Sequence, residues 1–175
     1  MAVEDVTAEI HGFSEPDSTP TPWTTGMERL RAADTYWLST VRPDGRPHVT
    51  PLIGVWHTEA LWFATGPEER KAQNLAENPS CVLMTGCSDL VAGALDLMIE
   101  GRAEQVTDDA DLEPAATAFA HKYPTGPWDF VVRHGAFSDR HAGGRVLVFR
   151  VRPLRGLGFR KGDLFSQTTW KGFSA

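Results

Sequence analysis

Residues 61–79 have the sequence LWFATGPEERKAQNLAENP, in which an apolar run passes through a short turn into an amphipathic segment. The apolar run, together with the preceding alanine, is typical of a buried β-strand that ends at Thr65. Pro67 suits the first position of a helix and acidic residues suit its first turn, so a helix is expected to begin there. Pro79 ends the helix, because the residue before a proline avoids the helical conformation. The stretch therefore predicts a strand followed directly by a helix.

On both sides of this unit, apolar runs alternate with turn residues, as is typical of antiparallel strands. Residues 43–45 (Pro-Asp-Gly) are a strong turn signal, and Pro51 is awkward in a central strand, so an interrupted ladder is expected there. Residues 124–144 are expected to form a loop. Strands are predicted at 36–41, 47–56, 60–65, 80–85, 95–106, 145–152 and about 154–160, and helices at 27–34, 66–78 and 107–123, the last capped by Thr107. This order predicts a mainly β (α+β) protein, a small antiparallel barrel with two to three helices against it.

The N-terminal residues differ in composition from the rest of the chain. Residues 1–25 are rich in proline and polar side chains and are expected to form an arm that lies on the remainder, with Trp23 as its anchor. Residues 26–175 are expected to form one domain, since 175 residues fit a single hydrophobic core.

Charge and composition exclude several classes of function. The net charge of −6 argues against a general binder of nucleic acid or of anionic membranes. No apolar run reaches the roughly 18–20 residues of a membrane span, and the acidic N-terminus lacks the features of a signal peptide, so a cytoplasmic location is expected. Cys81 and Cys87 are expected to be inert thiols, and no metal site is expected.

The strand–helix junction at 65–71 is the first candidate for a binding site. Free backbone N–H groups at a helix start favour an anion, and Arg70, Lys71 and the hydroxyl of Thr65 could hold a phosphate there. The alternative is an ordinary capped helix, because Glu68 and Glu69 already complement the helix dipole.

Two other features leave their role open. Trp170 stands in a polar tail, where it either caps the core or covers a ligand or a partner. His134 and His141 lie in the 124–144 segment, where a solvated loop is the default interpretation. The sequence contains no nucleophile with a matching base in a known motif. This absence is what we expect when a bound cofactor carries the reaction and the protein supplies the pocket.

Five segments together resemble a known superfamily. They are 38–51 (LSTVRPDGRPHVTP), 61–66 (LWFATG), 70–79 (RKAQNLAENP), 99–104 (IEGRAE) and 168–171 (TTWK). The sequence resembles the pyridoxamine 5′-phosphate oxidase-like superfamily of FMN- and deazaflavin-binding split-barrel proteins, and the tail resembles that of an actinobacterial branch.

The resemblance implies an antiparallel split β-barrel that forms a homodimer with two cofactor sites at the subunit interface. Thr65, Arg70 and Lys71 match positions that hold the cofactor phosphate. The backbone of Val49, Thr50, Pro51 and Leu52 matches the strand along the isoalloxazine ring. Asp96 falls near a position that contacts the ring or the ribityl chain, and Trp170 matches a tail tryptophan that approaches the site, in some cases from the other subunit.

Two departures narrow the implied function. The tail lacks the Arg-x-His motif of true pyridoxamine phosphate oxidases, which argues against oxidation of vitamin B6, and Gly172 interrupts the aromatic tail of the branch. The acidic pair at 68–69 lies where a polyglutamylated deazaflavin tail would pass, which favours FMN over the deazaflavin coenzyme F-420. The resemblance implies an oxidoreductase that transfers hydride to a small organic acceptor. The alternative is a non-catalytic protein that binds, stores or senses a flavin or a haem-like ligand.

Overall fold

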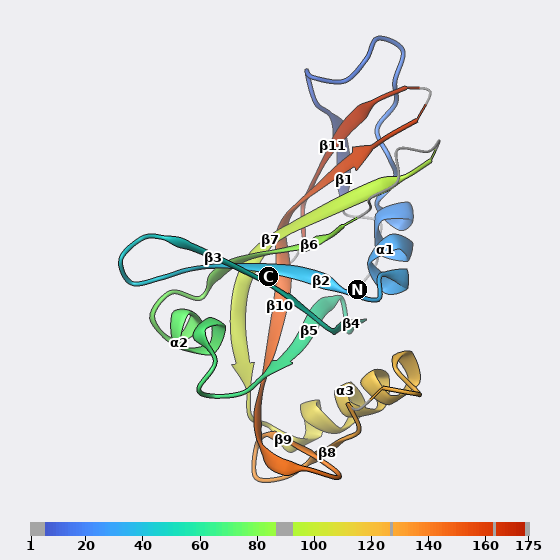
Figure 1. Ribbon diagram of the computed structural model, residues 1–175. Helices are drawn as coiled ribbons and strands as arrows, with labels where there is room; N and C mark the ends of the chain where they lie inside the picture. Colours follow the sequence, from blue (N-terminus) through green and yellow to red (C-terminus); the bar gives the residue numbers. More distant parts are fainter. Residues whose placement is uncertain (1–5, 87–92, 127, 163, 174–175) are drawn as a thin grey trace.

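A computed structural model describes residues 6–86, 93–126, 128–162 and 164–173. Within these ranges the chain forms a mainly antiparallel sheet and three helices, as predicted (Figure 1). The strands are β1 (Thr7–Ile10), β2 (Tyr36–Val41), β3 (Pro47–Leu52), β4 (Gly54–His57), β5 (Ala60–Thr65), β6 (Ser80–Thr85), β7 (Leu95–Val106), β8 (Phe130–Val132), β9 (Phe137–Asp139), β10 (Gly143–Arg160) and β11 (Ser166–Lys171). The helices are α1 (Trp23–Ala32), α2 (Arg70–Glu77) and α3 (Asp109–Lys122).

The long strand β10 organises the barrel. One edge of β10 pairs with β7, while its other edge pairs first with β5 and then with β11. The barrel is split where β5 leaves this edge and β11 takes its place. The two strands predicted at 145–152 and 154–160 are therefore one strand, with a register shift between Pro153 and Arg155 where proline cannot donate a ladder hydrogen bond.

The strand predicted at 47–56 is divided in two. β3 is an edge strand and pairs only with β2 among the described strands. Its outer edge has no neighbouring strand there, so Pro47 and Pro51, which lack an N–H group, are tolerated. The chain then turns at Ile53, and β4 pairs with β5 instead. Gly54 is required at this turn, because a Cβ atom there would lie 2.9 Å from the carbonyl oxygen of Trp62.

The helix boundaries differ from those predicted. α2 begins at Arg70 rather than at Pro67, because the Glu69 N–H bonds the carbonyl oxygen of Gly66 and closes a turn before the helix. The cap of α3 is Asp108 and not Thr107, since the Asp108 carboxylate accepts the N–H of Ala110. α1 begins earlier than predicted, and its first residue is the expected anchor, Trp23.

The N-terminal arm lies along the barrel. β1 pairs with β11 and so extends the sheet, and Trp23 packs edge-on against Trp56 and Trp170 at ring-centroid distances of 5.9 and 5.3 Å. The segment 124–144 is not wholly a loop, which corrects the prediction. Residues Phe130 and Phe137 of the β8–β9 hairpin stack at 5.0 Å and pack against α3.

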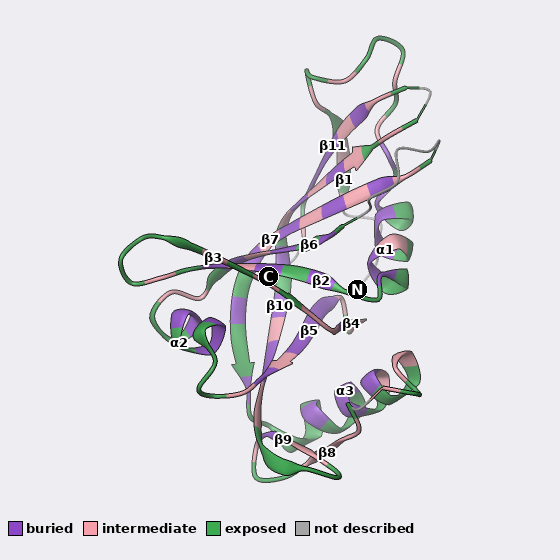
Figure 2. Cartoon of the chain, viewed as in Figure 1, coloured by how far each residue is buried: buried purple, intermediate pink, exposed green. Residues whose placement is uncertain are grey.

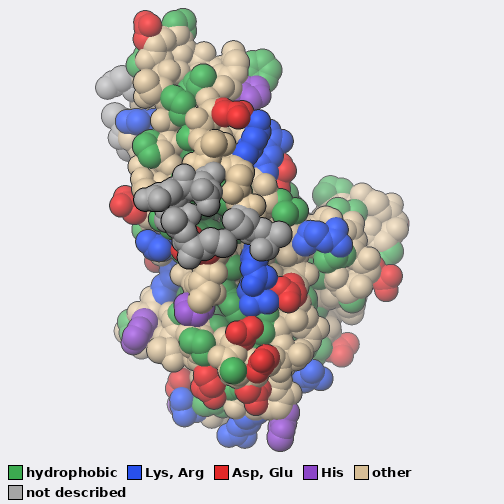
Figure 3. Space-filling view, turned by 180° about the vertical axis from the view of Figure 1, so that it is seen from behind, with side chains coloured by type: hydrophobic (Ala, Val, Ile, Leu, Met, Phe, Trp, Pro, Cys, Tyr) green, Lys and Arg blue, Asp and Glu red, His purple; other side chains and the backbone are tan. Residues whose placement is uncertain are grey.

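The core has two parts, on opposite faces of β5. Figure 2 shows that buried residues lie along β5 and on α3. Leu61 and Phe63 face the barrel interior with α1, β2, β6 and β7, while Trp62 faces α3 and the β8–β9 hairpin. Burial on both faces explains why β5 is an unbroken apolar run. None of the described helices is long and apolar enough to cross a membrane. On the face shown in Figure 3, acidic and basic side chains of the described residues are interspersed.

Candidate functional site

A cavity of about 470 Å³ opens between the barrel and the β8–β9 hairpin. This volume is within the range of about 300–1,000 Å³ that is typical of small-molecule sites. The cavity is lined by the ends of β3 and β5, the turn before α2 and its second residue, single residues of β8 and β10, and three residues outside the regular elements (Thr35, Pro51, Leu52, Ile53, Ala64, Thr65, Gly66, Glu69, Lys71, Trp128, Phe130 and Val146).

Three hydrogen-bond donors converge at the polar end of the cavity. The Glu69 carboxylate accepts from the Thr65 hydroxyl (3.0 Å) and from the backbone N–H of Gly66 (2.8 Å), both through Oε1. Its Oε2 accepts from the Lys71 ammonium. We call the three donors, Thr65 Oγ1, Gly66 N–H and Lys71 Nζ, the anion cradle. An anionic oxygen is held there by charge-assisted hydrogen bonds.

The helical geometry of α2 decides which cation joins the cradle. Residues 71, 72, 74 and 75 form the buried face of the helix, with residues 70, 73, 76 and 77 outside. The Lys71 side chain is therefore only 8% exposed, whereas Arg70 points to solvent on the opposite face. A buried ammonium requires an anionic partner, and Glu69 supplies it.

Charges near the cradle shift two pKa values. Burial alone would raise the pKa of Glu69, but the hydrogen bonds from Lys71 and Gly66 and the charge of Lys71 outweigh it and hold this pKa below its ordinary value. Burial and the positive charges of Arg42, Lys71 and Arg70 lower the pKa of His48 on β3. Glu69 therefore stays ionised and His48 stays neutral at neutral pH.

A buried polar chain holds α2 in place behind the cradle. The Asn74 amide donates to the Thr40 hydroxyl at 2.9 Å, and His48 Nδ1 lies 3.3 Å from the same hydroxyl. Asn74 is fully buried, so this contact fixes the helix against β2 and β3. These hydrogen-bonded side chains were not predicted from the sequence, although Asn74 is a polar residue on the buried face of α2, three positions after Lys71.

The rest of the cavity wall is apolar. Pro51, Leu52 and Ile53 form one side, and Phe130 with Val146 forms the other. Trp128 lies at the rim and is 39% exposed. Sequence reasoning missed Phe130 and Trp128, and the available signal was the presence of aromatic residues in a segment expected to be a solvated loop.

Four of the nine predicted site residues meet in this cavity: Pro51, Leu52, Thr65 and Lys71. Val49 and Thr50 lie on β3 but do not line it, and Arg70 points away.

Neither Asp96 nor Trp170 lines the cavity within one chain. Thr65 pairs with Leu147 of β10, whereas Asp96 pairs with Phe159, twelve residues further along that strand. At about 3.3 Å per residue this is a path of roughly 40 Å measured along β10. Asp96 forms an ion pair with Lys161 at 2.6 Å.

Trp170 is a core residue. It is fully buried, its indole N–H donates to the carbonyl oxygen of Thr21 at 2.8 Å, and its ring packs on Gly156 and Gly158. Of the two roles left open for this tryptophan, the structure shows that it completes the core and ties the N-terminal arm to it.

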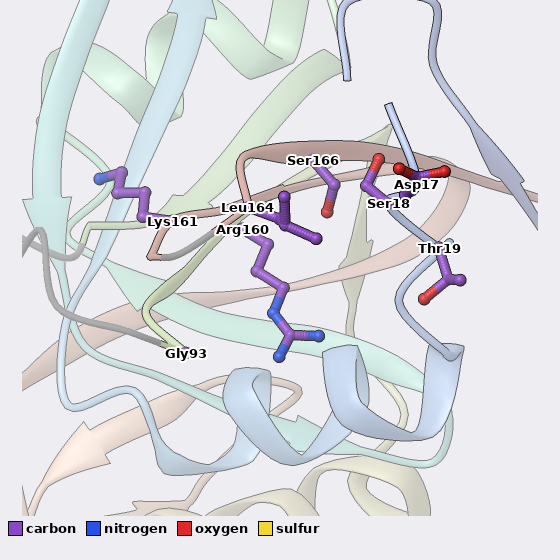
Figure 4. Close-up of a pocket in the computed structure, with 8 residues that line it drawn as sticks. All are labelled: Asp17, Ser18, Thr19, Gly93, Arg160, Lys161, Leu164 and Ser166. Carbon is purple, nitrogen blue, oxygen red and sulfur yellow. The ribbon is translucent and has the colours of Figure 1, made fainter. Parts of the chain in front are cut away.

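A second hollow of about 270 Å³ lies between the arm and the end of β10 (Figure 4). Arg160 and Lys161 extend in different directions, and Asp17 stands across the hollow from both. Because these side chains do not converge on one point, the hollow has no cradle comparable to that at Thr65. The histidines of the 124–144 segment lie outside both hollows.

The larger cavity fits a cofactor that carries a phosphate and a planar ring. The cradle offers a hydroxyl, a backbone N–H and an ammonium to a phosphate, and the apolar walls can accept a flat ring system. One feature opposes the fit, since the Glu69 carboxylate lies where the phosphate oxygens would bind.

Several solved structures share this fold. A conserved hypothetical protein from Mycobacterium tuberculosis is 20% identical, with a TM-score of 0.66 over 83% of this chain and 88% of that chain. An F-420 reductase is 23% identical, with a TM-score of 0.52 over 74% and 93%. A heme binding protein from Mycobacterium smegmatis is 17% identical, with a TM-score of 0.61 over 85% and 58%.

At these identities the similarity establishes the fold alone. No curated protein matches the sequence significantly. The sequence model of pyridoxamine 5′-phosphate oxidase, in contrast, matches residues 26–156, which include every strand from β2 to β9, most of β10 and the whole cradle. The chain therefore belongs to the pyridoxamine 5′-phosphate oxidase family.

Proposed function

We propose that the protein binds a flavin or deazaflavin, FMN in the first place, in the cavity beside β5, and acts as an oxidoreductase that transfers hydride to a small organic acceptor. The observation that carries this proposal is the convergence of Thr65, Gly66 and Lys71 on one anionic group at the polar end of an otherwise apolar cavity. Family membership and the likeness to an F-420 reductase support a flavin-type ligand.

The residues of the chain would bind and orient the cofactor. Lys71, Thr65 and the Gly66 N–H would hold the phosphate, and Pro51, Leu52 and Phe130 would enclose the ring and exclude water. The bound flavin supplies the hydride chemistry. Among the residues that line the cavity, the ionisable side chains are Glu69 and Lys71, both at the phosphate end. A proton needed at the acceptor would therefore come from solvent.

The first experiment is an absorbance spectrum of gently purified protein, followed by mass analysis of the small molecules that acid releases. Released FMN would support the first choice of cofactor, and a deazaflavin would support the alternative. A colourless preparation should be titrated with both compounds, because an expression host without the deazaflavin yields empty protein. If neither binds, the proposed function is wrong.

A pair of substitutions tests the geometry of the site. Lys71→Met should weaken FMN binding by at least about tenfold, because it removes the only cation among the cavity-lining residues. Arg70→Ala removes the same charge from the exposed face of α2 and should have a smaller effect. If Arg70→Ala weakened FMN as much as Lys71→Met does, the assignment of the phosphate to the cradle would be wrong.

We also propose a homodimer. Large apolar side chains are exposed on one sheet face, among them Trp37 (42%), Val41 (38%), Met84 (38%) and Leu154 (57%). The strand register places Trp37 beside Met84, and Val41 and Leu154 line the same groove of about 440 Å³. Such a contiguous patch is typical of a surface covered by a partner, and a second copy is the partner that the family favours.

Light scattering after size exclusion tests the dimer. Leu154→Asp should yield monomers, whereas Phe13→Asp, a charge added at a side chain 76% exposed on the N-terminal arm, should not. A wild-type monomer at high protein concentration would refute the proposal.

A non-catalytic binding protein is the second candidate. It is favoured by the lack of an ionisable side chain along the apolar walls of the cavity, and the likeness to a heme binding protein agrees with it. Anaerobic mixing with NADH, NADPH or a reduced deazaflavin separates the two candidates. Bleaching of the bound chromophore would support the oxidoreductase, and a bound cofactor that no donor reduces would support the binding protein.

A further inference from the structure

We infer that Glu69 is a specificity-determining residue of the proposed cofactor site: its carboxylate fills the anion cradle in the ligand-free protein, and a phosphate-bearing ligand binds only by expelling it. This inference rests on the proposed function for the identity of the ligand. That Glu69 occupies the cradle and competes with an anionic ligand is inferred from the contacts of Glu69 itself.

Glu69 uses every donor of the cradle. One carboxylate oxygen takes the Thr65 hydroxyl and the Gly66 N–H, and the other takes the Lys71 ammonium. These are the donors that a phosphate would need, and a second anion cannot share one ammonium with Glu69 without like-charge repulsion. The carboxylate therefore competes with the ligand for the same three groups.

Glu69 is the partner that can leave. Its side chain is 51% exposed, whereas that of Lys71 is 8% exposed. Glu69 also precedes the first residue of α2, in extended backbone with φ −72° and ψ 145°. Rotation of its side chain into water would leave the helix and the buried lysine in place, so the cradle can exchange one anion for another without refolding.

The exchange has a consequence for selectivity. A ligand must bring an anion that binds the cradle better than a tethered carboxylate does, so neutral analogues of the cofactor gain nothing from the cradle. Removing the charge of Glu69 should strengthen the binding of FMN and leave the binding of riboflavin, which has the same ring without the phosphate, unchanged.

The test compares Glu69→Gln with Glu68→Gln. Glu68 is the adjacent exposed acid, and its side chain does not line the cavity, so the control removes the same charge from the same turn. Titration calorimetry with FMN and with riboflavin should show FMN binding about tenfold tighter in Glu69→Gln, with riboflavin affinity and the Glu68→Gln variant near wild type. A Glu69→Ser variant, which also vacates the space, should bind FMN at least as tightly as Glu69→Gln does. Circular dichroism checks that each variant is folded.

A second measurement uses inorganic phosphate and the Gly66 amide signal in ¹⁵N NMR spectra. Phosphate should shift this signal in Glu69→Gln at concentrations that leave it unmoved in the wild type. If no flavin binds any variant but phosphate shifts Gly66 only when Glu69 is neutralised, the proposed function is wrong and the role of Glu69 stands. If flavins bind the wild type and neither FMN affinity nor the phosphate response changes in Glu69→Gln, the inference about Glu69 is overturned and the proposed function stands. If neither flavins nor phosphate respond in any variant, both are wrong.

Discussion

Gly158 of β10 leaves room for the indole ring of Trp170, and replacing this glycine by alanine tests how the core is packed. A Cβ atom at position 158 would lie 2.4 Å from Cη2 of Trp170 and 2.9 Å from Cζ3. Carbon atoms in optimal contact are about 3.5–4.0 Å apart, so the ring must move by about 1 Å. Its surroundings resist this movement, because Trp23 packs against the ring and the Thr21 carbonyl oxygen holds its N–H.

The cost follows from these contacts. Overpacking a filled core costs about 1–3 kcal/mol, and loss of the Thr21 hydrogen bond adds about 1 kcal/mol. Alanine recovers about 0.5–1 kcal/mol, because glycine loses more conformational freedom on folding. We expect Gly158→Ala to lower the free energy of unfolding by about 1–3.5 kcal/mol. Gly12→Ala should change it little, because no atom lies within 4 Å of a Cβ atom at position 12.

A double-mutant cycle isolates the clash. Trp170→Leu is itself destabilising, but it removes the ring atoms that alanine at position 158 would strike. In the Trp170→Leu background, Gly158→Ala should therefore cost less than about 0.5 kcal/mol, so that most of its cost in the wild type appears as a coupling free energy between the two positions. Urea unfolding is followed by far-ultraviolet circular dichroism at one fixed protein concentration, because any self-association would make stability depend on it. If the changes in the free energy of unfolding of the two single mutants simply add up in the double mutant, the packing assigned to Trp170 is refuted.

Three further predictions concern buried or paired ionisable groups. Burial lowers the pKa of Lys122 from 10.5 to about 8, so the folded protein binds fewer protons than the unfolded chain between these two pH values. The free energy of unfolding should therefore rise from about pH 8 to about pH 10.5, and partial exposure limits this rise to about 1–2 kcal/mol. Urea titrations of Lys122→Met should lose this rise. Burial raises the pKa of the Cys81 thiol from 9.0 to about 12. Alkylation of Cys81, located by mass spectrometry, should therefore be about a thousandfold slower in the native protein than in urea. Equal rates would contradict the burial of Cys81. The hydrogen bond from Arg150 is the main cause of the lowered pKa of Glu104. Arg150→Met should return the pKa of Glu104 toward its ordinary value in an NMR titration and lower the free energy of unfolding by about 1 kcal/mol. An unchanged pKa of Glu104 would exclude this ion pair.

The strand–helix unit at 60–77 could be predicted because its signals are local. An apolar run, a turn and an amphipathic segment determine β5 and α2, and they place Thr65 and Lys71 at the junction. The helical period also places Lys71 and Arg70 on different faces of α2, although both were predicted to bind the phosphate. Lys71 stands one and four positions before Ala72 and Leu75, on the buried face, whereas Arg70 shares its face with Gln73.

The roles of Trp170 and Asp96 could not be predicted from local signals. Both depend on which part of β10 lies beside which neighbour, and that register is fixed by strands far apart in the sequence. One feature of the sequence does agree with this register. Gly156 and Gly158 alternate on one face of β10, and two small residues at this spacing leave room for a large side chain from a neighbouring strand.

Glu69 shows why an anion site and its own blocking group arise from the same local sequence. Burying Lys71 in the ligand-free protein requires a negative partner, and an acid just before the helix is the nearest side chain able to supply one. The same carboxylate then opposes any phosphate. Stability without ligand and affinity for ligand should therefore respond to Glu69→Gln with opposite signs: the ligand-free protein should unfold more easily, while FMN should bind more tightly. A residue that merely capped α2 would affect the first property alone, so measuring both in one variant separates a capping role from competition with the ligand.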